Sequence, residues 1–167
     1  THKADLAVSS ITITLERSKK VAFSLPYLLS YAQYAGLNKW GKVPFSPGLL
    51  AKKSIGIEQG SVFKKALTTE HPDAYITEYP SHQTLIQALQ NGSIDFALMD
   101  AFTADYWQTQ SNNVIITLGK PFTYGYGFGI AVNPNEPALL KDLNEALLKY
   151  QNNGEFQKDY NTYLRVF

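Results

Sequence analysis

An arginine follows a cluster of four hydroxyl side chains near the start of the chain. The stretch SSITITLER places Ser9, Ser10, Thr12 and Thr14 ahead of Arg17. A guanidinium matches a carboxylate through two parallel, charge-assisted hydrogen bonds, and hydroxyl or backbone N–H groups can complete the coordination. These residues suit the binding of a carboxylate, although a surface arginine placed after an edge strand would leave the same pattern.

A carboxylate stands at a second position of interest. Asp100 follows the alternating run IDFALM and opens a segment with helical character. Ligands of open α/β sheets bind at the carboxyl ends of strands, where a carboxylate can accept hydrogen bonds from an ammonium group. An aspartate there also suits a plain helix N-cap. The junction QGS (59–61) leaves the same two alternatives, because its N–H groups could receive an anion or simply begin a helix.

Other chemistries have less support. The chain has no cysteine, which excludes a thiolate nucleophile, a zinc–cysteine site and a disulfide scaffold. The three histidines, His2, His71 and His82, lie in polar surroundings without a nucleophile-elbow motif, and no two of them have the spacing of metal ligands. We therefore expect no catalytic residue, no metal site and no cofactor.

The glycine-rich run GYGFG (125–129) superficially resembles a dinucleotide-binding loop. The strand, glycine loop and helix order of such a loop is missing, because IAVNP continues as another strand. We expect these glycines to lie where two backbones pass close together.

Composition narrows the class of protein. The 167 residues carry a formal net charge of +1 and are 44% hydrophobic, which argues against disorder and against nucleic-acid binding. No run of about 18 apolar residues occurs, so we expect no membrane-spanning helix.

Strand and helix patterns alternate from residue 50 to 118, which predicts βαβ units and a parallel sheet. The segment ADLAV (4–8) is typical of the end of a buried strand, and IDFALM of a strand with Ile94, Phe96 and Leu98 on one face. KWGKVPFSPGLL (39–50) reads as a loop. A helix is expected to begin at Ser81 and end at Gly92, and two closing helices are expected to be separated by Asn153 and Gly154.

Several of these motifs together resemble the polar amino-acid family of periplasmic solute-binding proteins, the receptors of ABC importers. The family pattern is an aspartate, an apolar run, small residues, a T-I-T-like triplet, Glu-Arg and then F-S-x-P-Y. The matching residues are Asp5, Thr12–Thr14, Glu16–Arg17, Phe23–Ser24 and Pro26–Tyr27. SIGIEQGSVF, LIQALQNGSIDFALMD and the C-terminal LNEALLKYQNNGEFQKDYNTYL resemble further family segments.

The resemblance implies a fold and a division into domains. The fold is α/β, of the type II periplasmic-binding class, with two lobes of parallel-rich sheets flanked by helices. Residues 33–123 would form lobe two, and residues 1–32 with 124–167 the remainder of lobe one with its hinge strands. The family usually has a further βαβαβ portion of lobe one ahead of Asp5, so lobe one is expected to be incomplete.

The resemblance also implies roles for individual residues. Arg17 would hold the α-carboxylate of an amino acid with help from Thr12 and Ser10, and Ser9 would lie nearby. Ser61 and Val62 would add contacts to the carboxylate, although the family more often has threonine at position 62. Asp100 would bind the α-ammonium group.

The expected function is that of a non-enzymatic, extracytoplasmic receptor for a polar or cationic L-amino acid, at the periplasmic or extracellular face of the membrane. Its partners would be the membrane subunits of an ABC transporter, and a second copy or a swapped segment could complete lobe one. Nucleic acid is not expected. The alternatives are a truncated module for sensing or protein assembly and a cyclohexadienyl-dehydratase-like enzyme.

Overall fold

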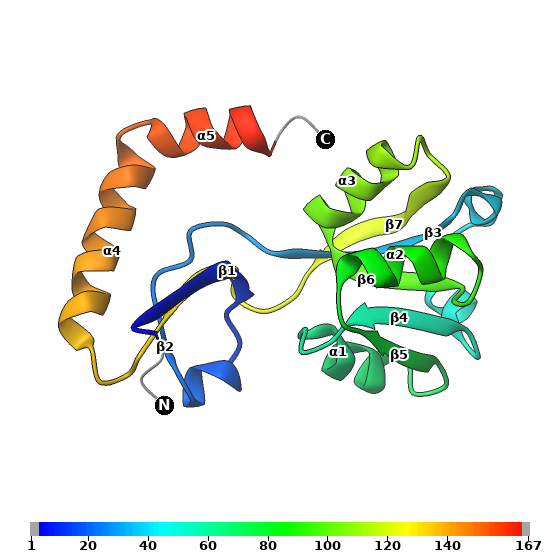
Figure 1. The fold of residues 1–167 in the computed structure, drawn as a ribbon, viewed down its shortest axis with the longest axis horizontal. Helices are drawn as coiled ribbons and strands as arrows, with labels where there is room; N and C mark the ends of the chain where they lie inside the picture. Colours follow the sequence, from blue (N-terminus) through cyan, green and yellow to red (C-terminus); the bar gives the residue numbers. More distant parts are fainter. Residues whose placement is uncertain (1–3, 165–167) are drawn as a thin grey trace. The chain divides into compact units, whose positions relative to one another are not determined.

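The computed structural model describes residues 4–164, which form two compact units (Figure 1). Of these residues, Tyr31–Phe122 form unit 2, and residues 4–30 and 123–164 form unit 1. His2 and the outermost residues of the predicted lobe one lie outside the described residues.

Unit 2 is a five-stranded sheet with the strand order β5-β4-β6-β3-β7. Its strands are β3 (Tyr31–Leu37), β4 (Ser54–Glu58), β5 (Tyr75–Tyr79), β6 (Phe96–Asp100) and β7 (Ile115–Thr123). β4 pairs in parallel with both β5 and β6, whereas β3 runs antiparallel to β6. The expected βαβ units with parallel strands are therefore confirmed for β4, β5 and β6, whereas the sheet as a whole is mixed because β3 runs antiparallel to β6.

Three helices connect and cover these strands, namely α1 (Phe63–Glu70), α2 (His82–Gln90) and α3 (Ala101–Gln110). One core cluster joins Leu85 and Leu89 of α2, Ala104 of α3 and Met99 of β6. Phe96 to Met99 are all buried, so β6 is covered on both faces rather than on the single face that the alternation suggested. A strand in the middle of a sheet with helices packed on it has no solvent face.

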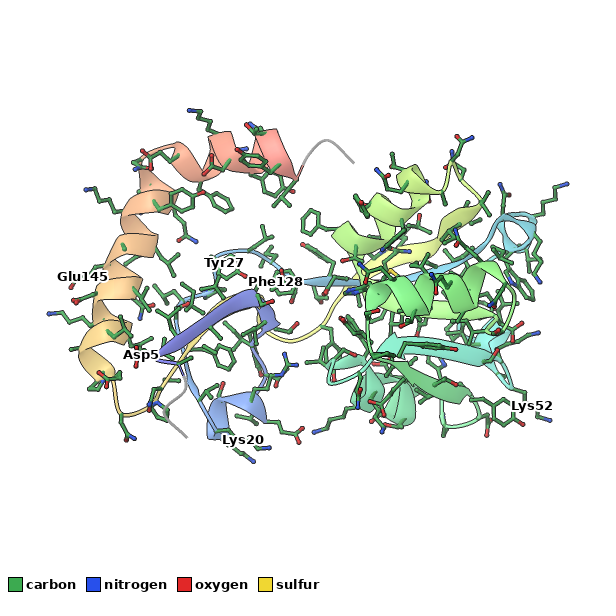
Figure 2. The ribbon with its side chains drawn as sticks, in the orientation of Figure 1. Asp5, Lys20, Tyr27, Lys52, Phe128 and Glu145 are labelled. Carbon is green, nitrogen blue, oxygen red and sulfur yellow. The ribbon has the colours of Figure 1, made fainter. Side chains whose placement is uncertain are left out.

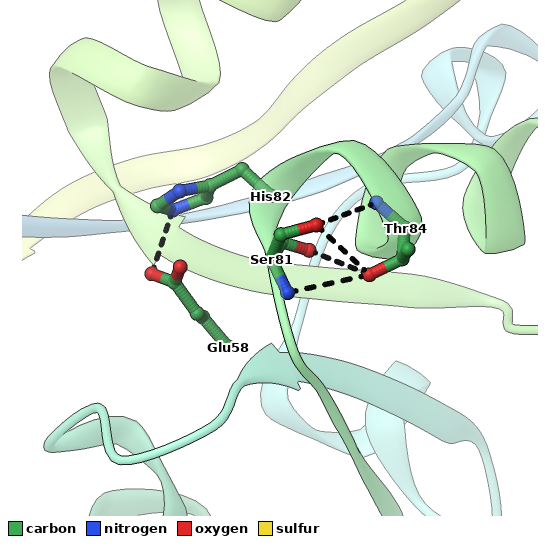
Figure 3. Close-up of polar contacts among 4 residues, drawn as sticks. All are labelled: Glu58, Ser81, His82 and Thr84. Carbon is green, nitrogen blue, oxygen red and sulfur yellow. Dashed lines mark hydrogen bonds and ion pairs between the residues drawn. The ribbon is translucent and has the colours of Figure 1, made fainter.

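The ends of α2 follow the expected signals. The Ser81 hydroxyl accepts a hydrogen bond from the Thr84 backbone N–H, and the Thr84 hydroxyl accepts one from the Ser81 N–H, which forms a capping box (Figure 3). Gly92, just beyond the helix, has φ +76°. The predicted start and stop of this helix are confirmed. The segment 39–50 contains the short 3₁₀ turns η2 (Asn38–Lys42) and η3 (Pro47–Leu50) within the expected loop.

Unit 1 contains a three-stranded antiparallel sheet with the order β1-β8-β2. Its elements are β1 (Leu6–Thr12), the 3₁₀ turn η1 (Arg17–Lys19), β2 (Ala22–Phe23), β8 (Phe128–Val132), α4 (Pro137–Asn152) and α5 (Glu155–Tyr163). Polar contacts join α4 to the segment after β2, where the Leu25 N–H donates to the Asn144 side chain at 2.8 Å. The break between α4 and α5 lies at Asn153–Gly154, as expected.

The prediction that residues 4–8 end a buried strand is wrong. Leu6 is 36% exposed and Val8 is 57% exposed. The physical reason is the position of β1, which lies at the edge of a sheet of only three strands. An apolar sequence predicts that a strand has a face to bury, but not that a neighbour covers it.

Candidate functional site

Arg17 is the first residue of η1, shortly after β1 ends at Thr12. Its Nη1 donates a hydrogen bond to the Thr12 carbonyl oxygen at 3.0 Å, and its backbone N–H donates to the Thr14 hydroxyl at 3.2 Å. The Thr14 hydroxyl therefore serves the turn, while the Thr12 carbonyl fixes the guanidinium against the end of the strand. The guanidinium of Arg17 is thus oriented by a hydrogen bond to the main chain.

The two serines of the motif lie in an irregular part of β1. The pairing of β1 with β8 shifts register between Ala7 and Ile11, and Ser10 within this bulge has φ +47°. Both Ser9 and Ser10 are exposed. A left-handed conformation of a residue other than glycine costs about 1–2 kcal/mol, and such residues and bulges are often found at functional sites.

Thr12 differs from the serines because its side chain is buried, with 5% exposure. Its methyl group would lie 2.6 Å from a Cβ atom on Gly125. Thr12 thus contributes packing and its carbonyl to the surroundings of Arg17.

The glycines of GYGFG occupy positions of close backbone approach, as expected. Gly125 has φ +75° and Gly127 has φ +94°, and a Cβ on either would lie within 3 Å of the carbonyl oxygen of Ile13 or Leu28, respectively. The Ile13 N–H donates to the Gly127 carbonyl at 2.8 Å, and the Phe128 N–H donates to the Leu28 carbonyl at 2.8 Å. Tyr27 and Phe128 lie close together beside these contacts, with ring centroids 6.5 Å apart (Figure 2).

In unit 2, Ser61 and Val62 lie between β4 and α1. The Ser61 N–H donates to the Glu58 carbonyl at 3.2 Å, across a turn in which Gly60 has φ +77°. Val62 is the N-cap residue of α1, and no side chain caps this helix. The Ser61 hydroxyl oxygen is buried and has no hydrogen-bond partner. A buried hydroxyl without a hydrogen-bond partner destabilises the folded state, and such groups are rare in native proteins.

Asp100 is the last residue of β6 and the N-cap residue of α3. Its side chain makes no capping hydrogen bond to the helix. Asp100 thus has the N-cap position that the sequence left as an alternative, but not the hydrogen bond of a capping side chain. Asp100 and the β4–α1 junction lie at the carboxyl ends of two adjacent parallel strands.

A second carboxylate at this edge was not among the predicted site residues. Glu58 is the last residue of β4, and its Oε2 lies 3.4 Å from Nε2 of His82, the first residue of α2 (Figure 3). The signal that could have found it is the run IGIEQG, in which a charged residue closes an apolar strand directly ahead of the glycine turn.

Burial changes the acidity of two groups in unit 2. Desolvation raises the pKa of the Asp105 carboxyl on α3, and desolvation together with the charge of Glu70 raises the pKa of Tyr34 on β3. Within residues 4–164, no group of three acidic, histidine or cysteine side chains gathers as a metal site would require. No helix in the same range has the length and apolar character needed to cross a membrane.

The chain is similar in sequence and structure to several known proteins. The ABC transporter arginine-binding protein 1 of Escherichia coli (strain K12) is 34% identical over 160 residues, which cover 94% of this chain and 65% of that protein. The chain thus spans about two thirds of the length of such curated relatives. An arginine transport-system periplasmic binding protein from Legionella pneumophila is 29% identical, with a TM-score of 0.89 over 97% of this chain and 73% of that one.

An ancestral amino-acid-binding protein, a precursor of cyclohexadienyl dehydratase, has a TM-score of 0.86 over 98% of this chain and 70% of that one. At 23% identity, this likeness shows the fold alone. The expected fold class is confirmed, with an α/β chain that matches periplasmic binding proteins over most of its length. The model of the bacterial extracellular solute-binding proteins, family 3, matches residues 1–166. The chain therefore belongs to that family.

Proposed function

We propose that this chain binds a polar or cationic L-amino acid as the extracytoplasmic receptor of an ABC importer, and that it is not an enzyme. Relatives that carry the names of arginine-binding, histidine-binding and glutamine-binding proteins support an amino-acid ligand. The name of the Legionella pneumophila structure supports a periplasmic location.

The observation that carries the proposal is the fixed guanidinium of Arg17. An amino acid at neutral pH presents a carboxylate, and a guanidinium held at the end of a strand can bind it with two charge-assisted hydrogen bonds. The bulge at Ser9 and Ser10 brings exposed hydroxyl and backbone groups to the same end of unit 1. Thr12 acts in this proposal mainly by orienting Arg17.

The second half of the binding site is assigned to unit 2. Asp100 would accept hydrogen bonds from the α-ammonium group, and Ser61 and Val62 would contribute hydroxyl and backbone contacts to the carboxylate. The ligand would then be held by groups of both units, and it would favour the conformation in which both sets bind it. The size of that preference equals the difference in its affinity for the two conformations.

The proposal extends to partners. The membrane subunits of the transporter would receive the loaded receptor. A second copy of the chain, or a segment exchanged with it, would cover the exposed edge strand β1 with its Leu6 and Val8 side chains. Sedimentation of the purified chain tests this last point, because a monomer at all concentrations would contradict it.

Titration calorimetry with a panel of L-amino acids tests the function. Arg17→Ala and Asp100→Asn are each expected to weaken binding by about a hundredfold, since each removes a charge-assisted interaction of about 1.5–3 kcal/mol and leaves a ligand charge unpaired. Lys19→Ala is the matched control, because it removes a cation from the same turn η1 and is expected to leave affinity unchanged.

Two outcomes would contradict the proposal. One is a chain that binds no amino acid of the panel, and the other is binding that persists at full strength in Arg17→Ala. Turnover of a cyclic acid by the wild-type chain would favour the dehydratase alternative instead.

A further inference from the structure

We propose that Glu58 selects ligands with a cationic side chain and that His82 positions its carboxylate for this purpose. The proposal rests on the proposed amino-acid binding and concerns a part of the ligand that Arg17 and Asp100 do not contact. It arises from the end of β4 and the start of α2 (Figure 3).

The first step is the place of Glu58 in the sheet. β4 and β6 are adjacent and parallel, with Gly56 opposite Ala97. Glu58 ends β4 two residues after Gly56, and Asp100 ends β6 three residues after Ala97. Neighbouring strands lie about 4.8 Å apart, so Glu58 and Asp100 end adjacent strands at the carboxyl edge, where ligands of such sheets bind.

The second step is the direction of the Glu58 side chain. A Cβ on Gly56 would lie 2.5 Å from a methyl group of Leu85, so this face of β4 is the one that α2 covers. Side chains two residues apart share a face of a strand. Glu58 therefore points toward the start of α2, where the structure places its carboxylate 3.4 Å from the His82 ring nitrogen. Its side chain keeps 36% exposure, so a ligand can still reach it.

The third step concerns a buried polar group at the same turn. Ser61, which closes the turn that begins at Glu58, has a buried hydroxyl oxygen without a hydrogen-bond partner. Such an atom is stabilised when a ligand group or an ordered water supplies the missing bond. A polar molecule bound at this turn could therefore supply the hydrogen bond that the Ser61 hydroxyl lacks.

The charge of the Glu58 side chain distinguishes between classes of amino acid. A cationic amino acid carries a cation on its side chain in addition to its α-ammonium group, and Glu58 and Asp100 supply a carboxylate for each from the carboxyl edge of unit 2. A neutral amino acid would leave the Glu58 carboxylate with His82 alone, and an acidic one would be repelled by it. The arrangement therefore discriminates through attraction and repulsion together.

Calorimetry with L-arginine and L-citrulline provides the test, because citrulline replaces the guanidinium by a neutral group of nearly the same shape. Glu58→Gln is expected to weaken arginine binding by about ten- to a hundredfold and to leave citrulline binding within about twofold. Glu145→Gln is the matched control, because it removes a carboxylate from the exposed surface of α4, and no change with either ligand is expected.

The role of His82 is tested by the difference between arginine and citrulline binding, which a general loss of structure would not change. His82→Ala is expected to weaken arginine binding by a few-fold without changing citrulline binding, and His82→Gln, which keeps a hydrogen-bond donor, is expected to restore most of the loss. In the Glu58→Gln background, His82→Ala should cause no further loss, because the two residues act through one carboxylate.

The outcomes separate this proposal from the function on which it rests. A wild-type chain that binds neither ligand would overturn both. Arginine binding that is unaffected by Glu58→Gln, or a loss that is equal for arginine and citrulline, would overturn the role of Glu58 and leave the proposed receptor function standing.

Discussion

Units 1 and 2 differ in how their parts are held in place. In unit 2, buried apolar side chains come from every strand except β5 and from all three helices, so the helices and the sheet form a packed core. Among the described residues of unit 1, the buried apolar side chains are Phe128, Ile130 and Val132, all on the central strand β8. Unit 1 relies instead on backbone hydrogen bonds, a bulge and glycine contacts.

This difference bears on the candidate site residues of each unit. Ser61, Asp100 and Glu58 stand at strand ends above a filled core, which holds them through packing. Arg17 depends on the hydrogen bond to the Thr12 carbonyl and on the path of the backbone after β1. Candidate binding groups are thus oriented by a packed core in unit 2 and by main-chain geometry in unit 1. We expect substitutions of buried apolar residues to destabilise unit 2 most, and substitutions of the glycines of GYGFG to act mainly on unit 1.

The largest expected effect is on the free energy of unfolding when a core side chain is truncated, and it should differ between the two units. Leu89→Ala in α2 removes a fully buried side chain and is expected to destabilise unit 2 by about 2.5–5 kcal/mol. Leu143→Ala in α4, where the side chain is half-buried, is expected to cost unit 1 about 1 kcal/mol. Trp40 and Trp107 both belong to unit 2, so their fluorescence during urea unfolding follows that unit, and amide exchange in β8 follows unit 1.

If Leu143→Ala destabilised unit 1 as much as Leu89→Ala destabilises unit 2, the proposed difference between the two cores would be contradicted. It would indicate that α4 is covered in solution by material outside the described residues, such as a second copy of the chain. Repeating the measurement at several protein concentrations separates a second copy from a covering within the same molecule.

A smaller effect is expected where unit 1 depends on backbone contact. Gly125→Ala combines a positive φ with a Cβ placed 2.6 Å from the Ile13 carbonyl oxygen, and is expected to cost about 2–3 kcal/mol. Gly154→Ala is the matched control in the same unit, since Gly154 has φ +88° but no atom within 4 Å of the added Cβ. It is expected to cost only about 1 kcal/mol.

Amide exchange of Phe128, whose N–H is bonded to the Leu28 carbonyl, reports both substitutions. Equal costs for the two alanine variants would show that φ alone, and not the close approach to Ile13, constrains this segment.

The smallest effect concerns the packing around α3 in unit 2. Because burial raises the pKa of the Asp105 carboxyl, the folded state binds this proton more tightly than the unfolded state does. The free energy of unfolding therefore includes the full contribution of this protonated carboxyl below the ordinary pKa of aspartate and loses it as pH rises through the raised pKa. At neutral pH the charged carboxylate destabilises the folded state. Asp105→Asn is expected to stabilise unit 2 at pH 7, and this gain should vanish at about pH 3.

Urea unfolding followed by tryptophan fluorescence at the two pH values measures this difference. A variant that is no more stable than the wild type at pH 7 would contradict the assigned cost of burial.

The sequence predicted the features that local chemistry decides. Ser81 and Gly92 bound α2 because a capping hydroxyl and a residue tolerant of positive φ work within one turn of chain. The glycines of GYGFG were correctly assigned to close backbone contacts because a following strand excludes a nucleotide loop. The roles of Arg17, Asp100 and the hydroxyl groups remain predictions.

The sequence could not predict what distant segments decide. The exposure of Leu6 and Val8 depends on how many strands accompany β1, and a local apolar pattern carries no such information. The bulge at Ser10 arises from the register between β1 and β8, which are far apart in the chain. Glu58 was missed because only the folded chain brings it to His82, 24 positions later in the sequence.

The pairing of β2 with β8 has a consequence for the order of folding. Ser24 and Ile130, which are hydrogen-bonded, are 106 positions apart in the sequence. Between them lies unit 2, whose first strand β3 is the neighbour of its last strand β7. Once β3 and β7 pair, the flexible loop that must close shrinks from about a hundred residues to about fifteen, which lowers the entropic cost by about 2 kcal/mol. Pairing within unit 2 would therefore ease the assembly of the small sheet of unit 1, and we expect that sheet to form after β3 and β7 have paired.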